Sequence, residues 1–195
     1  MSTSSFRNDK GAALIEFCLI LPVFLVLVFA IIDFGRLIHA RLIITNVTRE
    51  GANLASRDIK SGTDLIAMLR SSATPLDLNG AGRICISSIE AGITTRTAPI
   101  ISTQNPPVCS GSLTAASGAA SGINAGATNL GLTGAMYNHL VFKQANKASD
   151  INGVMVVETF YRFTPITPLP NFITNLWTGA GAIIGSRAVF CSIGE

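Results

Sequence analysis

Charged side chains are scarce in this chain of 195 residues, where they make up 13% of the sequence. Soluble domains usually carry about 25%, so part of the surface is expected to meet a membrane or a packed partner instead of water. The formal net charge is only +3, and the chain has no run of Lys or Arg that could follow a phosphate backbone. These shortages argue against a nucleic-acid-binding protein, and the length excludes a large multidomain enzyme.

Residues that hold metals or carry out catalysis are equally few. The two histidines, His39 and His139, are far apart in the sequence, and the four cysteines form no CxxC pair. The chain has no GxSxG, HExxH, P-loop or GxGxxG motif, and its acidic residues are too dispersed to supply a general acid and a general base from one element. We therefore expect no enzymatic activity, no metal site and no cofactor.

A long apolar run occupies residues 12–32, AALIEFCLILPVFLVLVFAII. As a helix it would be about 31 Å long, which matches the hydrocarbon core of a bilayer. A cleaved secretory signal is the alternative, but its apolar core is normally about 7 to 15 residues long, and no clean A-x-A site follows this run. The run predicts one transmembrane helix, preceded by a short cytoplasmic leader at residues 1–11.

Two residues within the run are unusual for a membrane helix. Glu16 places an acid where burial costs on the order of 2.5 to 3.5 kcal/mol at mid-bilayer, and less near a helix end. It is expected either to lie at the interface, favoured by the N-terminal end of the helix dipole, or to pair with a cation. Pro22 removes a backbone donor, and we expect a helix kink there.

Helical spacing continues past the apolar run. The side chains of Ile31, Phe34, Ile38, Leu42 and Thr45 fall within reach of one helix face. We therefore expect an amphipathic continuation at residues 33–60, and a helix of more than forty residues in all.

The beginning of the apolar run resembles the processing motif of type IV prepilins. That motif has a glycine, a cleavage point, a glutamate at the fifth position after the cut and an aromatic residue at the sixth, which correspond here to Gly11, Ala12, Glu16 and Phe17. Cleavage by a prepilin peptidase after Gly11 would turn Ala12 into an N-terminal amine. This amine could neutralise Glu16 of the same helix, at i,i+4, or Glu16 of a neighbouring subunit.

The resemblance becomes specific when the following residues are added. An apolar GAxxxEF anchor, then DFGR, a short gap and TxxxREGAxxAxR, all between residues 11 and 57, are similar to the TadE-like family of tight-adherence, Flp-type IV pilus systems. This resemblance implies a pilin-like α+β fold and a minor pilin or pseudopilin-like subunit for pilus assembly. It also implies three kinds of partner besides the lipid bilayer: the prepilin peptidase, other pilin-like subunits and inner-membrane assembly proteins. The alternatives are an uncleaved membrane scaffold of the secretion machinery and an adhesion module at the envelope surface.

The location follows from the leader and the cysteines, because charge counting favours neither side: Arg7 and Lys10 precede the run, and Arg36 and Arg41 follow it. A short polar leader suits a cytoplasmic peptidase, and cysteines in the body suit an oxidising compartment. We expect a single-pass protein of the bacterial inner membrane with a cytoplasmic N-terminus and a periplasmic or extracellular body.

Residues 61–195 are expected to form this extracytoplasmic α+β domain, with a small antiparallel sheet. Residues 110–135 are almost all small or polar, too poor in large apolar groups to offset their ordering entropy, and predict a flexible surface loop. The pattern predicts a short helix at 63–72 and one or two helical turns at 170–177, and strands at 83–90, 154–163 and 182–193. In the strand at 154–163 the apolar residues alternate with Glu158 and Arg162, which predicts a half-buried strand with Glu158 on the solvated face.

The three body cysteines allow one disulfide. Cys85 and Cys109 would close a loop worth roughly 3 kcal/mol in the chain-entropy model, and Cys109 lies in a proline-rich stretch that such a bridge would fix. A bridge from Cys85 to Cys191, between neighbouring strands, is the competing pairing. The sequence favours the first pairing only slightly.

Overall fold

The computed structural model describes residues 9–57, 62–142, 152–167 and 182–191. The chain divides into two compact units. One unit combines Met1–Ile38 with Thr164–Gly181, and the other combines His39–Phe163 with Ala182–Glu195. The predicted helical turns at 170–177 lie outside the described residues.

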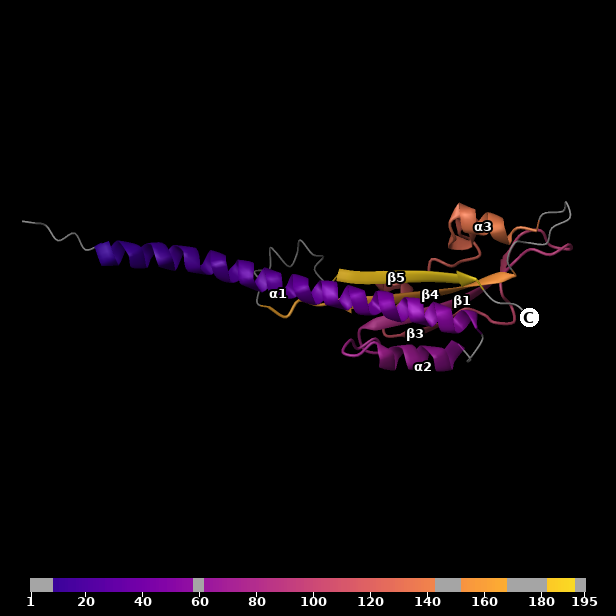
Figure 1. Cartoon of the computed structure of the whole chain (residues 1–195), viewed down its shortest axis with the longest axis horizontal. Coiled ribbons are helices and arrows are strands. Elements are labelled where there is room, and N and C mark those ends of the chain that lie inside the picture. Colours follow the sequence, from indigo (N-terminus) through magenta and orange to yellow (C-terminus); the bar gives the residue numbers. More distant parts are fainter. Residues whose placement is uncertain (1–8, 58–61, 143–151, 168–181, 192–195) are drawn as a thin grey trace, which may run out of the picture. The chain divides into compact units, whose positions relative to one another are not determined.

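A single helix, α1 (Asp9–Ser56), runs for 48 residues and contributes to both units (Figure 1). Its first half is almost uniformly apolar, and a helix is the form in which such a segment satisfies its backbone hydrogen bonds internally. The helix passes through Pro22 and continues on both sides of it. The predicted helix of more than forty residues is confirmed.

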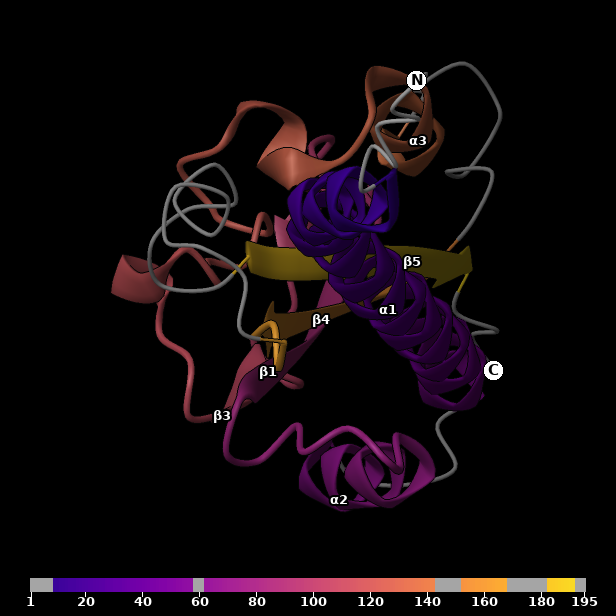
Figure 2. The ribbon, with the colours of Figure 1, turned by 90° about the vertical axis from the view of Figure 1, so that its left-hand side faces the viewer.

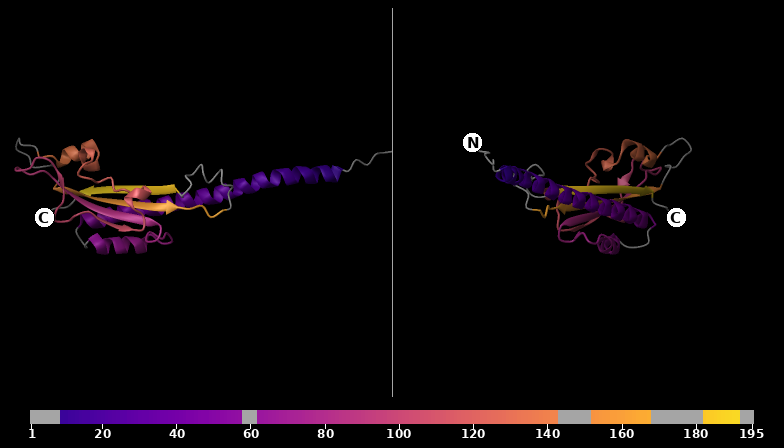
Figure 3. Two further views of the ribbon diagram at one scale, coloured as in Figure 1. Left: turned by 180° about the vertical axis from the view of Figure 1, so that it is seen from behind. Right: turned by 60° about the vertical axis from the view of Figure 1, so that its left-hand side comes forward.

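The second unit is built on a five-stranded antiparallel sheet. Its strands are β1 (Gly82–Glu90), β2 (Ile100–Ile101), β3 (Val108–Gly111), β4 (Gly153–Phe163) and β5 (Ala182–Cys191). The order is β2-β1-β4-β5, and β3 pairs with β1 beside β2. The opposed arrowheads of β4 and β5 are visible in Figure 3, left. The predicted mixed α+β fold, with a long N-terminal helix before a small antiparallel sheet, is confirmed.

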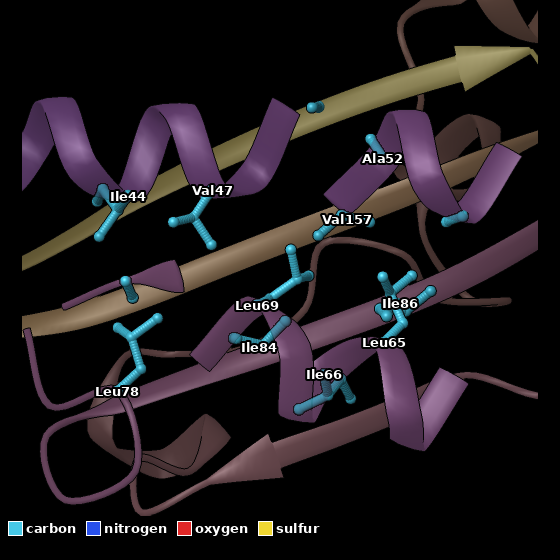
Figure 4. Packing of buried hydrophobic residues seen from close by; sticks show 13 residues of the cluster. Ile44, Val47, Ala52, Leu65, Ile66, Leu69, Leu78, Ile84, Ile86 and Val157 are labelled. Carbon is cyan, nitrogen blue, oxygen red and sulfur yellow. The ribbon is translucent and has the colours of Figure 1, made fainter. Parts of the chain in front are cut away.

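One face of this sheet is covered by the C-terminal part of α1 and by α2 (Gly62–Ser72). Ile44 and Val47 of α1 and Leu69 of α2 are buried in one cluster with Ile84 and Val157 of the sheet (Figure 4). Alternate residues of β1 and β4 therefore point into an apolar layer, which is what holds α1 against the sheet.

The opposite face carries a second cluster. It is formed by the turn η2 (Thr128–Gly131), the short helix α3 (Gly134–Leu140) and the residues before them, packed on Ile89, Val154 and Val156. Figure 2 shows α2 and α3 on opposite sides of the strands. The unit is thus a sheet between two layers.

Two expectations from the sequence need correction. The alternation in β4 predicted a half-buried strand with Glu158 on the wet face, but this is wrong, because both faces are covered and Glu158 is only 3% exposed. The apolar stripe of α1 past the run is also not its packed face. Ile31, Phe34, Ile38 and Leu42 are exposed, whereas the residues that pack are Ala40, Ile44, Val47, Ala52 and Ala55.

The small-residue segment 110–135 contains the end of β3, η1 (Ala115–Ser117), η2 and the start of α3. Of its large apolar side chains, Leu113, Ile123 and Leu132 are buried, and Leu130 is partly buried. The segment therefore contributes to the second layer, and its mobility stays a prediction.

Candidate functional site

The first half of α1 exposes apolar side chains along its length. Leu14, Phe17, Ile20 and Phe24 are each more than half exposed. Among the described residues, one helix is long and apolar enough to cross a membrane, and none of its most apolar stretch is buried. An exposed apolar surface of this extent needs an apolar environment, which is consistent with a single-pass membrane anchor.

The residues of the processing motif lie at the start of this helix. Gly11 and Ala12 fall within the first turn of α1, and Glu16 and Phe17 follow one turn later, both exposed. Residues four apart share a helix face, so Glu16 lies on the same side of the helix as position 12.

Gly11 has no packing role among the residues that the structure describes. A Cβ built on it meets nothing within 4 Å, and it occupies ordinary helical backbone. Glycine inside a helix costs about 1 kcal/mol relative to alanine. The folded subunit therefore offers no reason for a glycine at this position.

Gly51, near the other end of α1, is different. A Cβ there would lie 2.5 Å from Cδ1 of Leu69. Ala52 beside it is completely buried. The Gly51-Ala52 pair therefore lets α2 approach α1 closely, which explains small residues in the REGA part of the sequence motif.

Asp33, one residue past the predicted span, is a buried acid with a full set of donors. Its Oδ1 accepts from the Ile166 N–H at 3.1 Å and from Arg36 Nη1 at 3.3 Å, and its Oδ2 accepts from the Thr167 N–H at 3.3 Å and from the Thr167 hydroxyl. The residue is 4% exposed. It ties the chain that follows β4 to α1 within one unit.

These contacts decide the ionisation of Asp33. Burial raises the pKa of its carboxyl, but the hydrogen bonds from the Thr167 hydroxyl, from the N–H groups of Ile166 and Thr167 and from Arg36 outweigh burial and hold the pKa below its ordinary value. The sequence analysis did not single out Asp33. The signal for it was an acid directly after an apolar run with an arginine at i+3, both in the DFGR string.

A second polar group stands on the sheet face that carries the small-residue segment. Glu158 of β4 lies opposite Arg187 of β5, with Arg187 Nε 2.8 Å and Nη2 2.5 Å from its Oε1. The Gly122 N–H donates to Oε1 at 3.0 Å, and the Ser121 hydroxyl donates to Oε2. Arg187 Nη1 also donates to the Gly131 carbonyl at 2.8 Å.

Glu158 and Arg187 hold the small-residue segment 110–135 largely through hydrogen bonds with its backbone. Arg83 of β1 adds a bond from Nη1 to the Ala119 carbonyl at 3.1 Å. A Cβ at Gly122 would clash with the Arg187 guanidinium, so glycine is required where the chain approaches the ion pair. Sequence reasoning missed Glu158 as a binding group because it treated the opposite strand face as solvated.

Cys85 and Cys109 are joined by a disulfide, and they stand directly opposite each other in the β1–β3 register. This is the pairing that the sequence slightly favoured. Cys191 ends β5, is exposed and unbridged, and is separated from β1 by β4. Cys18 is exposed on the anchor. Among the described residues, no group of three or more His, Cys, Asp or Glu could hold a metal ion.

Comparison with known proteins gives one match. The family model described as TadE-like protein matches residues 11–53, from Gly11 to just past Gly51. No curated protein and no solved structure matches the chain. The matched residues hold the exposed anchor, Asp33 and the small residues that meet α2, whereas the sheet lies outside them. Residues 11–53 therefore resemble the TadE-like family, and the rest of the chain lies outside this match.

Proposed function

We propose that this protein is a minor pilin or pseudopilin-like subunit, held in the bacterial inner membrane by α1, that takes part in assembly of a tight-adherence pilus. The observation that carries the proposal is the exposed apolar half of α1, which begins with the Gly11, Glu16 and Phe17 pattern and lies within the TadE-like match. Such a helix is stored in lipid before assembly and packs against other subunits afterwards.

The glycine at position 11 supports cleavage of the leader. It costs helix stability and occupies open space, while Gly51 on the same helix has a packing reason. A requirement from outside the subunit explains it: a prepilin peptidase must admit the backbone on either side of the Gly11–Ala12 bond, and a side chain there would obstruct the approach.

Cleavage also gives Glu16 a partner. The new amine at Ala12 is positive, lies at i−4 from Glu16 and belongs to the same low-dielectric environment. Within one subunit the pair neutralises two charges. Between subunits it fixes the axial position of one helix against the next, because a shifted register would leave both charges unpaired in an apolar surrounding.

The disulfide supports the orientation. Bridges of this kind persist in oxidising compartments and are rare in the cytosol, so Cys85–Cys109 favours a body outside the inner membrane. The N-terminus then faces the cytoplasm. Partners in this assignment are the bilayer, the prepilin peptidase, other pilin-like subunits and inner-membrane assembly proteins.

The test is the N-terminal residue of the mature protein, determined by mass spectrometry on protein from membranes of its native host. We expect a start at Ala12. The variant Gly11→Val should retain the leader, whereas Gly35→Val should be processed normally, since Gly35 is the matched helical glycine with nothing within 4 Å of a Cβ. An intact leader in the unaltered protein would instead support a permanent, uncleaved scaffold of the secretion machinery.

A further inference from the structure

The unit that contains the anchor half of α1 exposes apolar side chains at the end of the predicted span and beyond it. Ile166, on the chain after β4, is 67% exposed. On α1, Ile31 and Phe34 are also more than half exposed. We call these three exposed side chains the patch. They come from two parts of the sequence, and the Asp33 hydrogen bonds join the backbones of those parts.

Asp33 sets the height of Ile166 relative to the span. The Ile166 N–H lies 3.1 Å from Asp33 Oδ1, so the backbone of Ile166 is displaced from the Asp33 Cα by no more than roughly 7 Å. Asp33 directly follows the predicted span 12–32, and each helical residue rises about 1.5 Å. The interfacial layer of a bilayer is about 5 to 7 Å thick on each side. The Asp33 hydrogen bonds therefore hold the backbone of Ile166 close to the end of the predicted span, where that layer begins.

The chemistry around Ile166 suits lipid. From Phe163 to Ser186 the sequence has no charged side chain, and burial of charges is what makes entry into the interface unfavourable. The nearby acid, Asp33, is 4% exposed and bound by donors from Ile166, Thr167 and Arg36. Its charge is thus buried and bound by donors, so it is not presented at the surface.

We propose that residues 164–167 rest on the outer interfacial layer of the bilayer, with the Ile166 side chain inserted among the lipids and Asp33 as the residue that positions them there. The occupant of the patch is the lipid surface, because Ile31 and Phe34 follow the exposed apolar side chains of the anchor along α1, and Ile166 is linked to that helix through Asp33. This proposal rests on the membrane-anchoring role of α1 proposed above.

The experiment uses the full chain reconstituted in phosphatidylcholine vesicles, with an environment-sensitive fluorophore on one cysteine at a time. Ile166→Cys and the matched control Ile93→Cys are made in a Cys18→Ser, Cys191→Ser background, which keeps the Cys85–Cys109 disulfide. Ile93 is also an exposed isoleucine, 52% accessible. Ile93 comes shortly after the end of β1. That end of β1 pairs with Gly153, the first residue of β4, whereas Phe163 is the last residue of β4.

Lipids with a nitroxide near the headgroup and iodide in the buffer serve as the two quenchers. We expect the label at Ile166 to be quenched by the lipid nitroxide at least twofold more than the label at Ile93, and by iodide at least threefold less. Adding Asp33→Ala should move the Ile166 label toward the Ile93 values, because its positioning bonds are lost. Equal iodide quenching at Ile166 and Ile93 overturns the proposal.

A label on native Cys18, in a Cys191→Ser variant, separates this proposal from the anchor itself. If Cys18 is shielded from iodide while Ile166 is not, the anchor stands and the interfacial contact is refuted. If Cys18 is open to iodide, the membrane anchor is refuted and the contact with it. Protection of Ile166 that disappears on dilution of the protein in lipid would show that a second copy covers the patch, which also overturns the proposal.

Discussion

Glu158 and Arg187 face each other across β4 and β5, and the glutamate of this pair also binds the chain that crosses the sheet. Its Oε1 lies 2.5 Å from Arg187 Nη2 and 3.0 Å from the Gly122 nitrogen. The side chain of Glu158 is 4% exposed and that of Arg187 is 36% exposed. An ion pair on one face of the sheet thus binds the backbone of a segment with few large apolar side chains of its own.

Removal of the carboxylate should release this segment. Glu158→Gln removes the charged partner of Arg187. Because the Arg187 side chain is 36% exposed and water can solvate part of its charge, we expect a loss of about 2 kcal/mol in the free energy of unfolding, less than for a pair buried on both sides. Backbone exchange at residues 121–122 should rise by more than the exchange at Val156 in the sheet. Chemical denaturation and hydrogen exchange measure the two effects.

Arg187→Gln in the Glu158→Gln background is the control for this prediction. The two substitutions should cost less together than the sum of their separate effects, because each alone leaves its partner uncompensated. Strict additivity would show that the pair is not coupled.

The disulfide should contribute to the stability of the unit that contains the sheet. Cys85 and Cys109 are separated by 24 positions, and closing a loop of this length is worth roughly 3 kcal/mol in the chain-entropy model. Cys85→Ser with Cys109→Ser should lower the denaturation midpoint accordingly. Cys191→Ser, which changes an exposed unbridged thiol, should leave the midpoint unchanged; an equal shift in both variants would contradict the assignment.

Local pattern was sufficient for α1, α2 and the three longest strands, because each depends on neighbours in the sequence, but it did not predict β2, β3 or α3. The apolar run and its helical continuation predicted α1, and alternation predicted β1, β4 and β5, all within a few residues of the observed bounds. The helix from Gly62 to Ser72 followed from the same kind of signal.

Pattern failed where a contact comes from a distant part of the chain. On α1 the apolar residues Phe34 and Leu42 share one helix face, but both are exposed. The face that packs on the body uses Ile44 and smaller residues, because α2 approaches α1 closely at Gly51. Glu158 appeared to be a solvent residue because its partners, at 121–122 and 187, cannot be paired with it from spacing alone. Asp33 likewise meets Ile166 only in the folded chain.

Loss of the Asp33 carboxylate should loosen the chain after β4. Hydrogen bonds to charged groups are worth about 1.5 to 3 kcal/mol, so Asp33→Ala should raise the exchange rates of the Ile166 and Thr167 amides by at least about tenfold. Hydrogen exchange with mass spectrometry on the detergent-solubilised full chain measures this change. Glu50→Gln, an exposed acid on the same helix, should leave both amides protected, and equal protection in Asp33→Ala would show that the bonds are dispensable.

The close approach of Leu69 to Gly51 predicts that the part of α1 matched by the family model needs a glycine at position 51 in order to pack on α2. Gly51→Ala inserts a methyl group 2.5 Å from Leu69 Cδ1, and overpacking of this kind costs about 1 to 3 kcal/mol. The gain in helix propensity from alanine, about 1 kcal/mol, offsets only part of that cost, so we expect net destabilisation by thermal or chemical denaturation.

Leu69→Ala separates the steric effect from any other role of Gly51. Alone, this substitution empties a completely buried site and should cost about 2 to 5 kcal/mol. In the double variant the methyl group introduced at position 51 occupies part of the space that Leu69 vacates, so Gly51→Ala should become neutral or stabilising in that background. If Gly51→Ala is equally destabilising with and without Leu69, close packing of α1 on α2 is not the reason for the glycine. A matched Gly35→Ala variant, where a Cβ meets nothing within 4 Å, should raise stability or leave it unchanged, because only the difference in helix propensity acts there.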